Sequence, residues 1–410
     1  MASEVVTALI LIRCAAHLFP KTCPRDMPDD VISVLHVIDT GGPGGAETIF
    51  LQMVTGLDPA RFRSVAVVGD KGWLPEQLVK RSLIPHILSA KGSFKTGYLL
   101  ALRRLVRHRK IDVIVAHLYG SAIYASLLGR MMCLPVVSVL HGQSDVAHSD
   151  RLAPLRSGIV RKGSRKVVFV SEHLKQHLGA RLRLAESQCA VIPNGVDAEV
   201  FRPCRNRSLR SELALADDAI LVGAIGNIRA PKAYDVLLRA ARILLDRSQR
   251  FHFVIAGDDS NDLGRELVEL GRSLGIERQL SFLGLRADVA QILHNLDAFV
   301  LSSRTEGFSI ACIEAMACGV PVIATRSGGP EEILEGGAGI LVPTDDPEAI
   351  AQAVDDVTSS KGLAEALTTK ALMRVQQQYS LGRMLCQYEA LLESLVRHPQ
   401  HELADFGNNP

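Results

Sequence analysis

The sequence predicts an α/β protein made of two doubly wound parallel-sheet domains that face each other across a cleft. Apolar strand-like runs alternate with helix-like runs, and the alternation occurs twice along the chain. In each half a glycine-containing turn follows the first strand. The polar, irregular residues 201–208 separate the halves. With 410 residues, the chain is also too long for one ordinary hydrophobic core.

Apolar runs predict the strands of the first half. They are expected at Val31–Ile38, Ser64–Val68, Ile111–Ala116, Val136–Leu140 and Lys166–Val170. The glycine-rich turn at residues 41–45 leads into a helix expected from Ala46 to Leu57.

The second half repeats this pattern. Its strands are expected at Ala219–Gly226, Phe251–Ala256, Leu280–Leu283, Ala298–Ser302, Pro321–Ala324 and Gly339–Val342. Asp235 is predicted to be the N-cap of a helix that ends at Leu245. The tail from Leu372 to Val396 is predicted to be helical and to cover a sheet.

Composition narrows the class of protein. A hydrophobic fraction of 47% with 22% charged residues is typical of globular domains. The eight cysteines show no paired spacing, so they indicate neither a zinc site nor a disulfide framework, and reduced cysteines in the cytosol fit better. Residues 1–204 hold 26 Lys and Arg against 16 Asp and Glu, whereas residues 205–410 hold 20 against 28. This asymmetry suggests domains with different partners.

Basic residues cluster at Arg103–Lys110 and between Arg151 and Lys166. Such runs are usually solvated faces, and the alternative is attraction to an anionic membrane leaflet. Nucleic-acid binding is disfavoured because aromatic residues are only 5% of the chain. The apolar residues 5–19 are too short for a membrane span and are interrupted by Arg13. We interpret them as an extension before the first strand, with a surface-lying anchor as the alternative.

Two glutamates, Glu306 and Glu314, stand eight positions apart around a predicted loop-to-helix junction. A buried strand precedes them, so Glu306 is expected at the carboxyl edge of a sheet and Glu314 inside the helix. The helix N-terminus between them favours an anion. Two carboxylates around an anion site suit a phosphorylated sugar bound through its hydroxyl groups. Two solvated helix carboxylates are the alternative.

Glycine-rich turns follow the first strand of each half. Residues 41–47, which include Gly44 and Gly45, match neither a Walker A motif nor GxGxxG, which disfavours an ATPase or a nicotinamide enzyme. Residues 226–232 end in Lys232, which together with Arg229 could bind a diphosphate, and two surface cations beside a turn are the less favoured alternative. His141 ends an apolar strand, where it is either a satisfied buried residue or a partner for a sugar hydroxyl.

Together these segments resemble the family-4 retaining glycosyltransferases of the GT-B fold, over about residues 31–396. The most specific element is the E-x7-E pair formed by Glu306 and Glu314. Further similarities lie at Val191–Pro203, Gly328–Ile333 and Gly339–Pro343. The resemblance implies an N-terminal extension (1–30), an acceptor-side domain (31–204), a nucleotide-sugar domain (205–380), a helix crossing back to the first domain (381–397) and a tail (398–410).

The resemblance also implies roles for single residues. Glu306 and His141 would lie at the donor sugar and Lys232 at the diphosphate, and these three would take part in catalysis. Glu314 would hold the nucleotide ribose. Backbone amides of Phe308, Ser309 and Ile310 would meet the diphosphate, and Gly44 and Gly45 would approach it from the other domain.

One position departs from the family pattern. Asn227 stands where these enzymes commonly have an arginine, so the usual two-cation clamp depends on whether Arg229 takes its place. Removing a phosphate donor from a site that stabilises a leaving diphosphate is costly. A catalytically inactive partner protein of the same fold is therefore one alternative function, and a sugar-nucleotide epimerase is another.

The implied reaction is transfer of a sugar, with retention, from a nucleoside-diphosphate sugar to a hydroxyl group. We expect a UDP-sugar as donor, no cofactor and no metal ion, because the chain has no DxD triplet. The basic first domain suggests a glycan or lipid-linked acceptor, a cytoplasmic location and attachment to the inner membrane leaflet.

Overall fold

The computed structural model describes residues 31–90, 95–142 and 152–397. The predicted extension (1–30) and tail (398–410) lie outside these residues. The chain forms two compact units. Unit 1 holds the described residues up to Val170, then Lys175–Ile192 and those from Leu385 onward, and unit 2 holds Ser171–Leu174 and Pro193–Met384. The chain leaves unit 1 at Ile192, earlier than the boundary expected in residues 201–208. The reason is that Val196 pairs with Ser380 of unit 2.

Unit 1 contains a seven-stranded parallel sheet in the order β3-β2-β1-β4-β5-β6-β7. Its central strands are almost completely buried, because helices cover both faces. The strands are β1 (Ile32–Ile38), β2 (Phe62–Val68), β3 (His86–Ile87), β4 (Val113–His117), β5 (Val136–Leu140), β6 (Lys166–Phe169) and β7 (Cys189–Val191). The helices are α2 (Gly45–Gly56), α3 (Trp73–Lys80), α4 (Thr96–His108), α5 (Tyr119–Met132), α6 (Ala153–Gly163) and α7 (Glu172–Leu182).

The last helix, α16 (Leu381–Arg397), begins in unit 2 and continues into unit 1. Within unit 1 its Glu389 and Glu393 form ion pairs with Arg61 at 2.9 and 2.7 Å. Glu389 also accepts a hydrogen bond from the backbone N–H of Asp58, just after α2. Because Tyr388 is fully buried, the helix is part of the core of unit 1.

Unit 2 contains a six-stranded parallel sheet in the order β10-β9-β8-β11-β12-β13. The strands are β8 (Ile220–Ile225), β9 (Phe251–Ala256), β10 (Leu280–Phe282), β11 (Ala298–Leu301), β12 (Val322–Thr325) and β13 (Ile340–Val342). The helices are α8 (Ser208–Glu212), α9 (Tyr234–Arg247), α10 (Asp262–Ser273), α11 (Val289–Leu293), α12 (Ile310–Ala317), α13 (Gly329–Ile333), α14 (Pro347–Ser359) and α15 (Lys361–Gln378).

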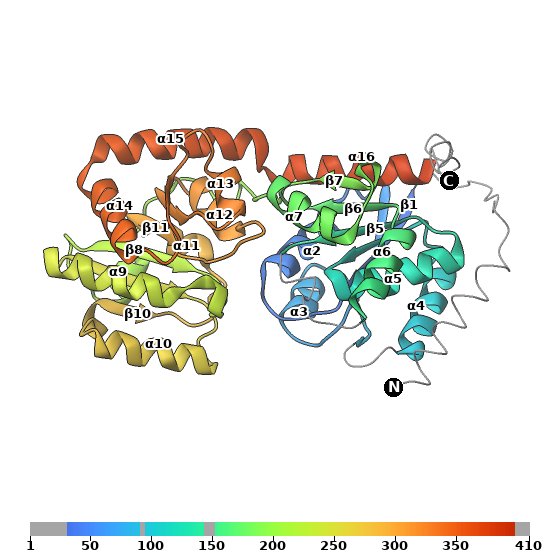
Figure 1. Cartoon of the computed structure of the whole chain (residues 1–410), viewed down its shortest axis with the longest axis horizontal. Coiled ribbons are helices and arrows are strands. Elements are labelled where there is room, and N and C mark those ends of the chain that lie inside the picture. The colour runs from blue at the N-terminus through green and yellow to red at the C-terminus, as the bar shows by residue number, and fades with distance from the viewer. Residues whose placement is uncertain (1–30, 91–94, 143–151, 398–410) are drawn as a thin grey trace. The chain divides into compact units, whose positions relative to one another are not determined.

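The main core of unit 2 lies between this sheet and two helices, α9 and α14, which pack side by side (Figure 1). Leu238, Leu244 and Val354 are fully buried in it. The apolar positions of α9 recur at helical spacing, which is why one face of this helix faces the sheet. The carboxyl ends of β8 and β11 then place the loops that follow them at one edge of the sheet.

The structure corrects one prediction. Asp235 is not an N-cap, because α9 already begins at Tyr234 and Ala233 occupies the capping position. The Asp235 carboxylate instead pairs with Arg304. The predicted helical tail consists of two helices, α15 and α16, which separate at Tyr379 and Ser380. The short edge strands β3 and β7 were not predicted.

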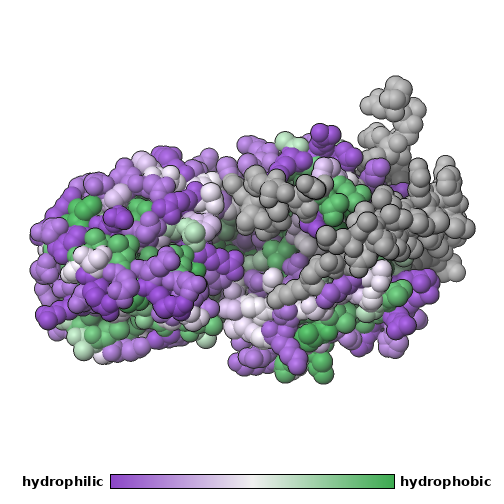
Figure 2. All heavy atoms as spheres, turned by 60° about the horizontal axis from the view of Figure 1, so that its bottom comes forward, coloured by the Kyte–Doolittle hydropathy of each residue, from purple (hydrophilic) through white to green (hydrophobic). Residues whose placement is uncertain are grey.

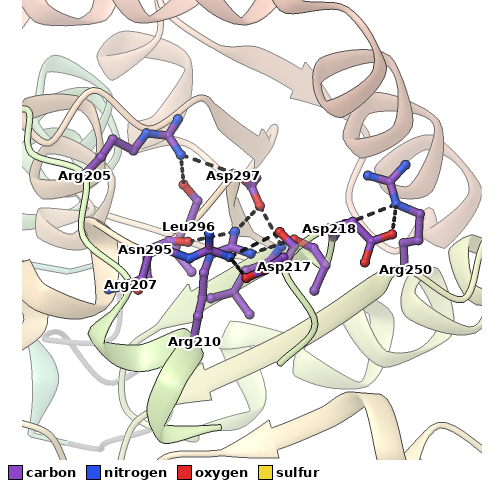
Figure 3. A network of polar contacts seen from close by, with 11 residues as sticks. Arg205, Arg207, Arg210, Asp217, Asp218, Arg250, Asn295, Leu296 and Asp297 are labelled. Atoms are coloured by element: carbon purple, nitrogen blue, oxygen red, sulfur yellow. Dashed lines mark hydrogen bonds and ion pairs between the residues drawn. The ribbon is translucent and has the colours of Figure 1, made fainter. Parts of the chain in front are cut away.

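A pocket of about 810 Å³ lies in unit 2 at the amino-terminal ends of its strands, beside Ile220, Phe251 and Asp297. No predicted site residue lines it. Figure 3 shows that the charged side chains here point toward one another: Arg210 pairs with Asp297, and Arg207 pairs with Asp217. These pairs join the segment after residue 204 to the sheet, and we interpret the cluster as structural.

Replacing Arg210 by methionine is expected to lower the free energy of unfolding of unit 2 by about 3 kcal/mol, because it removes one partner of a mostly buried ion pair. The Arg210 side chain is 11% exposed and donates to Asp297 at 2.5 Å and to the carbonyl oxygen of Ala219 at 2.6 Å. Arg207→Met is the control, because its partner is solvent-exposed and such pairs contribute little. Circular dichroism during chemical unfolding would measure the difference. An equal effect of both substitutions would contradict the prediction.

Candidate functional site

The loop after β8 is held in a fixed shape by three hydrogen bonds. The Tyr234 hydroxyl donates to the carbonyl oxygen of Gly226 at 2.9 Å, and Asn261 donates to that of Ile228 at 3.0 Å. Ser302 donates to the carbonyl oxygen of Lys232 at 2.9 Å. Gly226 has a φ of 152°, which favours glycine. The loop therefore presents Lys232 from a rigid support.

Lys232 and Glu306 are in direct contact. The Lys232 Nζ donates to Glu306 Oε1 at 2.6 Å, and Ser303 Oγ donates to the same oxygen, also at 2.6 Å. The Glu306 side chain is 9% exposed and that of Lys232 is 25% exposed. One oxygen of the carboxylate thus takes both donors and leaves Oε2 for another partner. The ammonium carries three protons, so it can keep Glu306 and still bind an anion.

Residues 304–307 are fixed mainly through their backbone. The N–H of Arg304 donates to the carbonyl oxygen of Pro231 at 2.7 Å. Glu306 forms a parallel bridge with Gly328, a position that also favours glycine because its φ is 114°. Ser171 Oγ donates to the carbonyl oxygen of Gly307 at 2.7 Å. These contacts preorganise the Glu306 carboxylate before any ligand binds.

Helix α12 begins directly after this loop. Its N-cap is Ser309, whose Oγ accepts a hydrogen bond from the N–H of Cys312 at 3.3 Å. The N–H groups of the first two helical residues, which include Ile310, remain for another acceptor, as at most helix N-termini. Phe308 is buried and packs edge-to-face on Tyr379 at 5.6 Å between ring centroids. The amides predicted to bind the diphosphate therefore lie at a helix N-terminus that the packing of Phe308 on Tyr379 holds in place.

Glu306 lies close enough to α12 to affect it electrostatically. Burial, and then the negative charge of Glu306, raises the pKa of the Cys312 thiol above its ordinary range. The same two causes raise the pKa of the Tyr234 hydroxyl. Glu306 is therefore close to both the first turn of α12 and the start of α9, where the Lys232 loop ends.

Glu314 lies in the second turn of α12 and is half-buried. Burial raises the pKa of its carboxyl group to about 7 from an ordinary value of 4.5. Among the described residues its carboxylate has no hydrogen-bonding or ion-pairing partner. Glu314 is thus not brought into contact with Glu306 or Lys232, and its carboxylate is poised to change charge near neutral pH.

Arg229 precedes Lys232 in the same loop and is exposed. Across residues 31–90, 95–142 and 152–397, no carboxylate pairs with it. Asn227, at the position of the expected arginine, is half-buried between Gly226 and the buried Ile228. The loop therefore offers one cation held by Glu306 and a second, unpaired one at Arg229.

In unit 1, Gly44 is the N-cap of α2 and Gly45 is its first residue. The Glu47 side chain folds back over this turn. A Cβ atom on Gly44 would lie 2.3 Å from Glu47 Oε2, so a larger residue here would displace the Glu47 side chain. Thr40 Oγ1 donates to Glu47 Oε1 at 2.7 Å. Glu47 thus already places a negative charge at the start of α2.

His141 directly follows β5 and contacts a residue that the sequence did not single out. His117 Nδ1 lies 3.1 Å from His141 Nε2. Burial lowers the pKa of His141 to about 4, so its ring is neutral at physiological pH. The sequence did not predict that His117, Ser303 and Tyr379 contact the candidate site residues. The position of Ser303 directly after a buried strand could have indicated it, whereas His117 and Tyr379 are indistinguishable from core residues in the sequence.

Two family models match the chain. One, described as Glycosyltransferase Family 4, covers residues 43–200, and the other, Glycosyl transferases group 1, covers residues 219–360. A D-inositol 3-phosphate glycosyltransferase of Actinosynnema mirum is 31% identical over 295 residues, which cover 66% of this chain and 70% of the relative. This chain belongs to the family-4 glycosyltransferases. The corresponding enzyme of Mycobacterium marinum is 27% identical and covers 82% of this chain and 70% of the relative.

Solved structures share the GT-B fold of this family-4 glycosyltransferase. HepE of Anabaena, solved in complex with UDP and glucose, aligns with a TM-score of 0.80 at 20% identity, over 88% of this chain and 100% of HepE. A glycosyltransferase from Rickettsia africae aligns with a TM-score of 0.79 at 22% identity, over 90% of this chain and 100% of the other. This glycosyltransferase is therefore built from two Rossmann-like units.

Proposed function

We propose that this glycosyltransferase moves a hexose, with retention of configuration, from a UDP-sugar to a hydroxyl group of a glycan or lipid-linked acceptor. The observation that carries the proposal is the Lys232–Glu306 pair, fixed at the carboxyl edge of a parallel sheet beside the N-terminus of α12. A solved protein of the same fold binds UDP-glucose, which supports the choice of donor.

In this proposal each group acts where charge develops. As the bond to the sugar breaks, negative charge grows on the leaving diphosphate, and Lys232, Arg229 and the first amides of α12 stabilise it. The free Oε2 of Glu306 accepts a hydroxyl group of the sugar. Lys232 and Ser303 hold Oε1 and thereby fix the carboxylate, so that in this proposal Glu306 orients the donor. The diphosphate itself takes the proton of the acceptor.

A thermal-shift series with UDP, GDP, ADP and TDP, in EDTA, tests the donor and the absence of a metal requirement. A nucleotide at 100 times its dissociation constant should stabilise the protein by about 2.7 kcal/mol. A rise in the melting temperature with UDP, and with none of the other three nucleotides, supports the proposal. The absence of a shift with every nucleotide would favour an inactive partner protein.

The acceptor needs a separate test. The curated relatives are named as D-inositol 3-phosphate glycosyltransferases, so inositol phosphate is the second candidate acceptor. Release of UDP from UDP-glucose would be followed with inositol phosphate, with a lipid-linked glycan precursor and with neither. NMR of the product would then show whether the anomeric configuration is retained. An inverted product would contradict the proposed mechanism.

Membrane attachment is proposed from charge. Arg104, Arg107, Arg109 and Lys110 are exposed at the end of α4. Hydrophilic residues dominate much of the face seen in Figure 2, where apolar ones form separate areas. Within the described segments, no helix combines the length and apolar character that crossing a bilayer requires. We expect salt-sensitive binding to vesicles that contain anionic lipid, with a contribution of about 1 kcal/mol per basic residue. Vesicle flotation would compare the wild type with an Arg104→Gln/Arg107→Gln variant, each with anionic and with neutral vesicles. Equal binding of the wild type to anionic and neutral vesicles would contradict the prediction.

Nucleotide binding is expected to release a proton from Glu314. In the ligand-free protein its carboxyl pKa is about 7. Ribose hydroxyl groups that donate to the ionised carboxylate would lower this pKa, so UDP affinity should rise with pH and fall below pH 7. In the ligand-free protein, the raised pKa means that the ionised carboxylate destabilises the fold. The free energy of unfolding therefore falls as pH rises from 4.5 to about 7.

Titration calorimetry at pH 7, in two buffers with different heats of ionisation, measures the released proton. The Glu314→Gln variant is the control, because protons of UDP itself contribute equally to both proteins. If both proteins release the same number of protons, Glu314 does not touch the ribose.

A further inference from the structure

Two helices of unit 1 begin beside a carboxylate of the protein itself. The first is α2, whose first turn contains Glu47 and whose N-cap is Gly44. A Cβ atom on Gly44 would collide with Glu47 Oε2, so this oxygen lies over the N-cap. The other oxygen, Oε1, accepts a hydrogen bond from Thr40 Oγ1 at 2.7 Å. A free helix N-terminus attracts phosphate, but here the negative charge of Glu47 already occupies that position.

The second helix is α5, and its carboxylate comes from Asp39, which directly follows β1. A Cβ atom on Gly120, in the first turn of α5, would collide with Asp39 Oδ2. The backbone N–H of Ser121 donates to the same carboxylate. Burial raises the pKa of Asp39, and the negative charges of Glu47 and Asp70 add to this rise. The three carboxylates are therefore close enough to repel one another and any further anion.

The positive charges near these carboxylates do not neutralise them. Asp70 follows β2, which lies next to β1 in the sheet. The lysines of the adjoining loops, Lys71 and Lys95, are exposed to solvent. Among the described residues, no lysine, arginine or histidine forms an ion pair with Asp39 or Glu47. The starts of α2 and α5 therefore keep their negative charge.

Two buried hydroxyl groups near Asp39 have no partner. The Tyr98 side chain of α4 is 6% exposed and Ser121 is 0% exposed, and neither hydroxyl forms a hydrogen bond with the described residues. Burial, and then the charge of Asp39, raises the pKa of the Tyr98 hydroxyl, so this group lies near the carboxylate. Hydroxyl groups donate and accept, as those of a sugar do. The surroundings of Asp39 therefore suit an uncharged ligand that carries hydroxyl groups.

We propose that Glu47 and Asp39 select an acceptor whose reacting end carries no phosphate, namely an uncharged sugar or cyclitol. The inference rests on the proposed function and on the expected role of unit 1 as the acceptor-side domain. A phosphate at the start of α2 or α5 would lie against a carboxylate, and such a contact between like charges rejects the wrong partner. This selection separates the chain from curated relatives that are named as D-inositol 3-phosphate glycosyltransferases.

Inorganic phosphate is a probe for this exclusion that needs neither donor nor acceptor. Trp73 is the only tryptophan of the chain, and the next residue, Leu74, donates to the carbonyl oxygen of Gly41 at 2.9 Å. Its fluorescence therefore reports on the loop that leads into α2. Glu47→Gln removes the charge but keeps an acceptor for Thr40. At constant ionic strength, Glu47→Gln should respond to phosphate at concentrations at least about tenfold lower than the wild type.

Glu186→Gln is the matched control for this titration. It removes the same charge from an exposed position of unit 1, outside α2 and α5, and should respond as the wild type does. A Glu47→Gln protein that responds to phosphate no more than the wild type would overturn the inference. An equal gain in Glu186→Gln would also overturn it, because the effect would then come from net charge alone.

Transfer kinetics of the full chain test the consequence for the acceptor. UDP release from UDP-glucose is followed with sugars and cyclitols offered with and without a phosphate, such as inositol and inositol 3-phosphate. The uncharged member of a pair should have a kcat/KM about 100-fold higher, and Glu47→Gln should reduce this preference about tenfold. A wild-type preference for the phosphorylated member would overturn the inference. If no acceptor supports UDP release, the proposed function fails, and the phosphate titration still decides whether unit 1 excludes anions.

Discussion

Replacing Lys232 by methionine is expected to lower kcat by a factor of about 10²–10³, as for removal of one preorganised donor to a developing anion. Methionine keeps an unbranched apolar side chain, one atom shorter, but loses the charge. Glu306 keeps its hydrogen bond from Ser303 at 2.6 Å, so the loop should retain its shape. The KM for the donor should change much less than kcat, because the diphosphate gains charge mainly in the transition state. Measuring UDP release over a range of donor concentrations separates the two parameters.

The control is Arg239→Met, which removes an exposed cation from α9 and should leave both parameters unchanged. A kcat of Lys232→Met within threefold of the wild type would exclude Lys232 from stabilising the leaving group.

Glu306→Ala is expected to abolish transfer while UDP still binds, because it removes the shared acceptor of Lys232 and Ser303. Near-normal turnover by a folded Glu306→Ala protein would remove Glu306 from the mechanism.

The second large effect is a loss of stability of unit 1 in mild acid. Burial lowers the pKa of His36 to about 3, that of His141 to about 4 and that of His117 well below 6.5, so all three stay neutral when folded. The unfolded chain binds a proton on each below about pH 6.5. Their contribution to stability is therefore complete above pH 6.5 and is lost as pH falls. The fall in the free energy of unfolding should approach about 1.4 kcal/mol per pH unit for each histidine, or about 4 kcal/mol per pH unit for the three together.

Trp73 reports this transition without interference from unit 2, because it is the only tryptophan of the chain and begins α3 in unit 1. Its fluorescence in urea, measured between pH 7 and pH 5, gives the slope. Burial raises the pKa of Asp39, which changes stability in the opposite sense and makes the measured slope a lower limit for the histidines. His36→Leu should lower the slope by about one proton. A free energy of unfolding that is constant between pH 6.5 and pH 5 would contradict the prediction.

Much of the fold was predictable, because buried parallel strands are continuous apolar runs. The predicted strands Val136–Leu140 and Phe251–Ala256 coincide with β5 and β9. Strands β3 and β7 were missed because they are two and three residues long, lie at the sheet edges and are only partly buried.

The candidate site was only partly predictable. Sequence motifs indicated both Lys232 and Glu306, but as separate ligand contacts, and nothing in the sequence indicated an ion pair between residues 74 positions apart. The contact of His117 with His141 depends on the order of β4 and β5 in the sheet. The bonds that fix residues 302–309 are mostly made by backbone atoms, which sequence patterns do not display.

The contribution of α16 to unit 1 constrains how the chain matures during synthesis. Glu389, Glu393 and Tyr388 complete the surface and core around the end of α2, yet they are made long after the rest of that unit. Unit 2 supplies nearly all of the intervening chain. At about 5–20 residues per second, that interval lasts roughly 10–40 s. During it, the first half of the protein lacks the buried α16 side chains, Tyr388 among them, that complete its core.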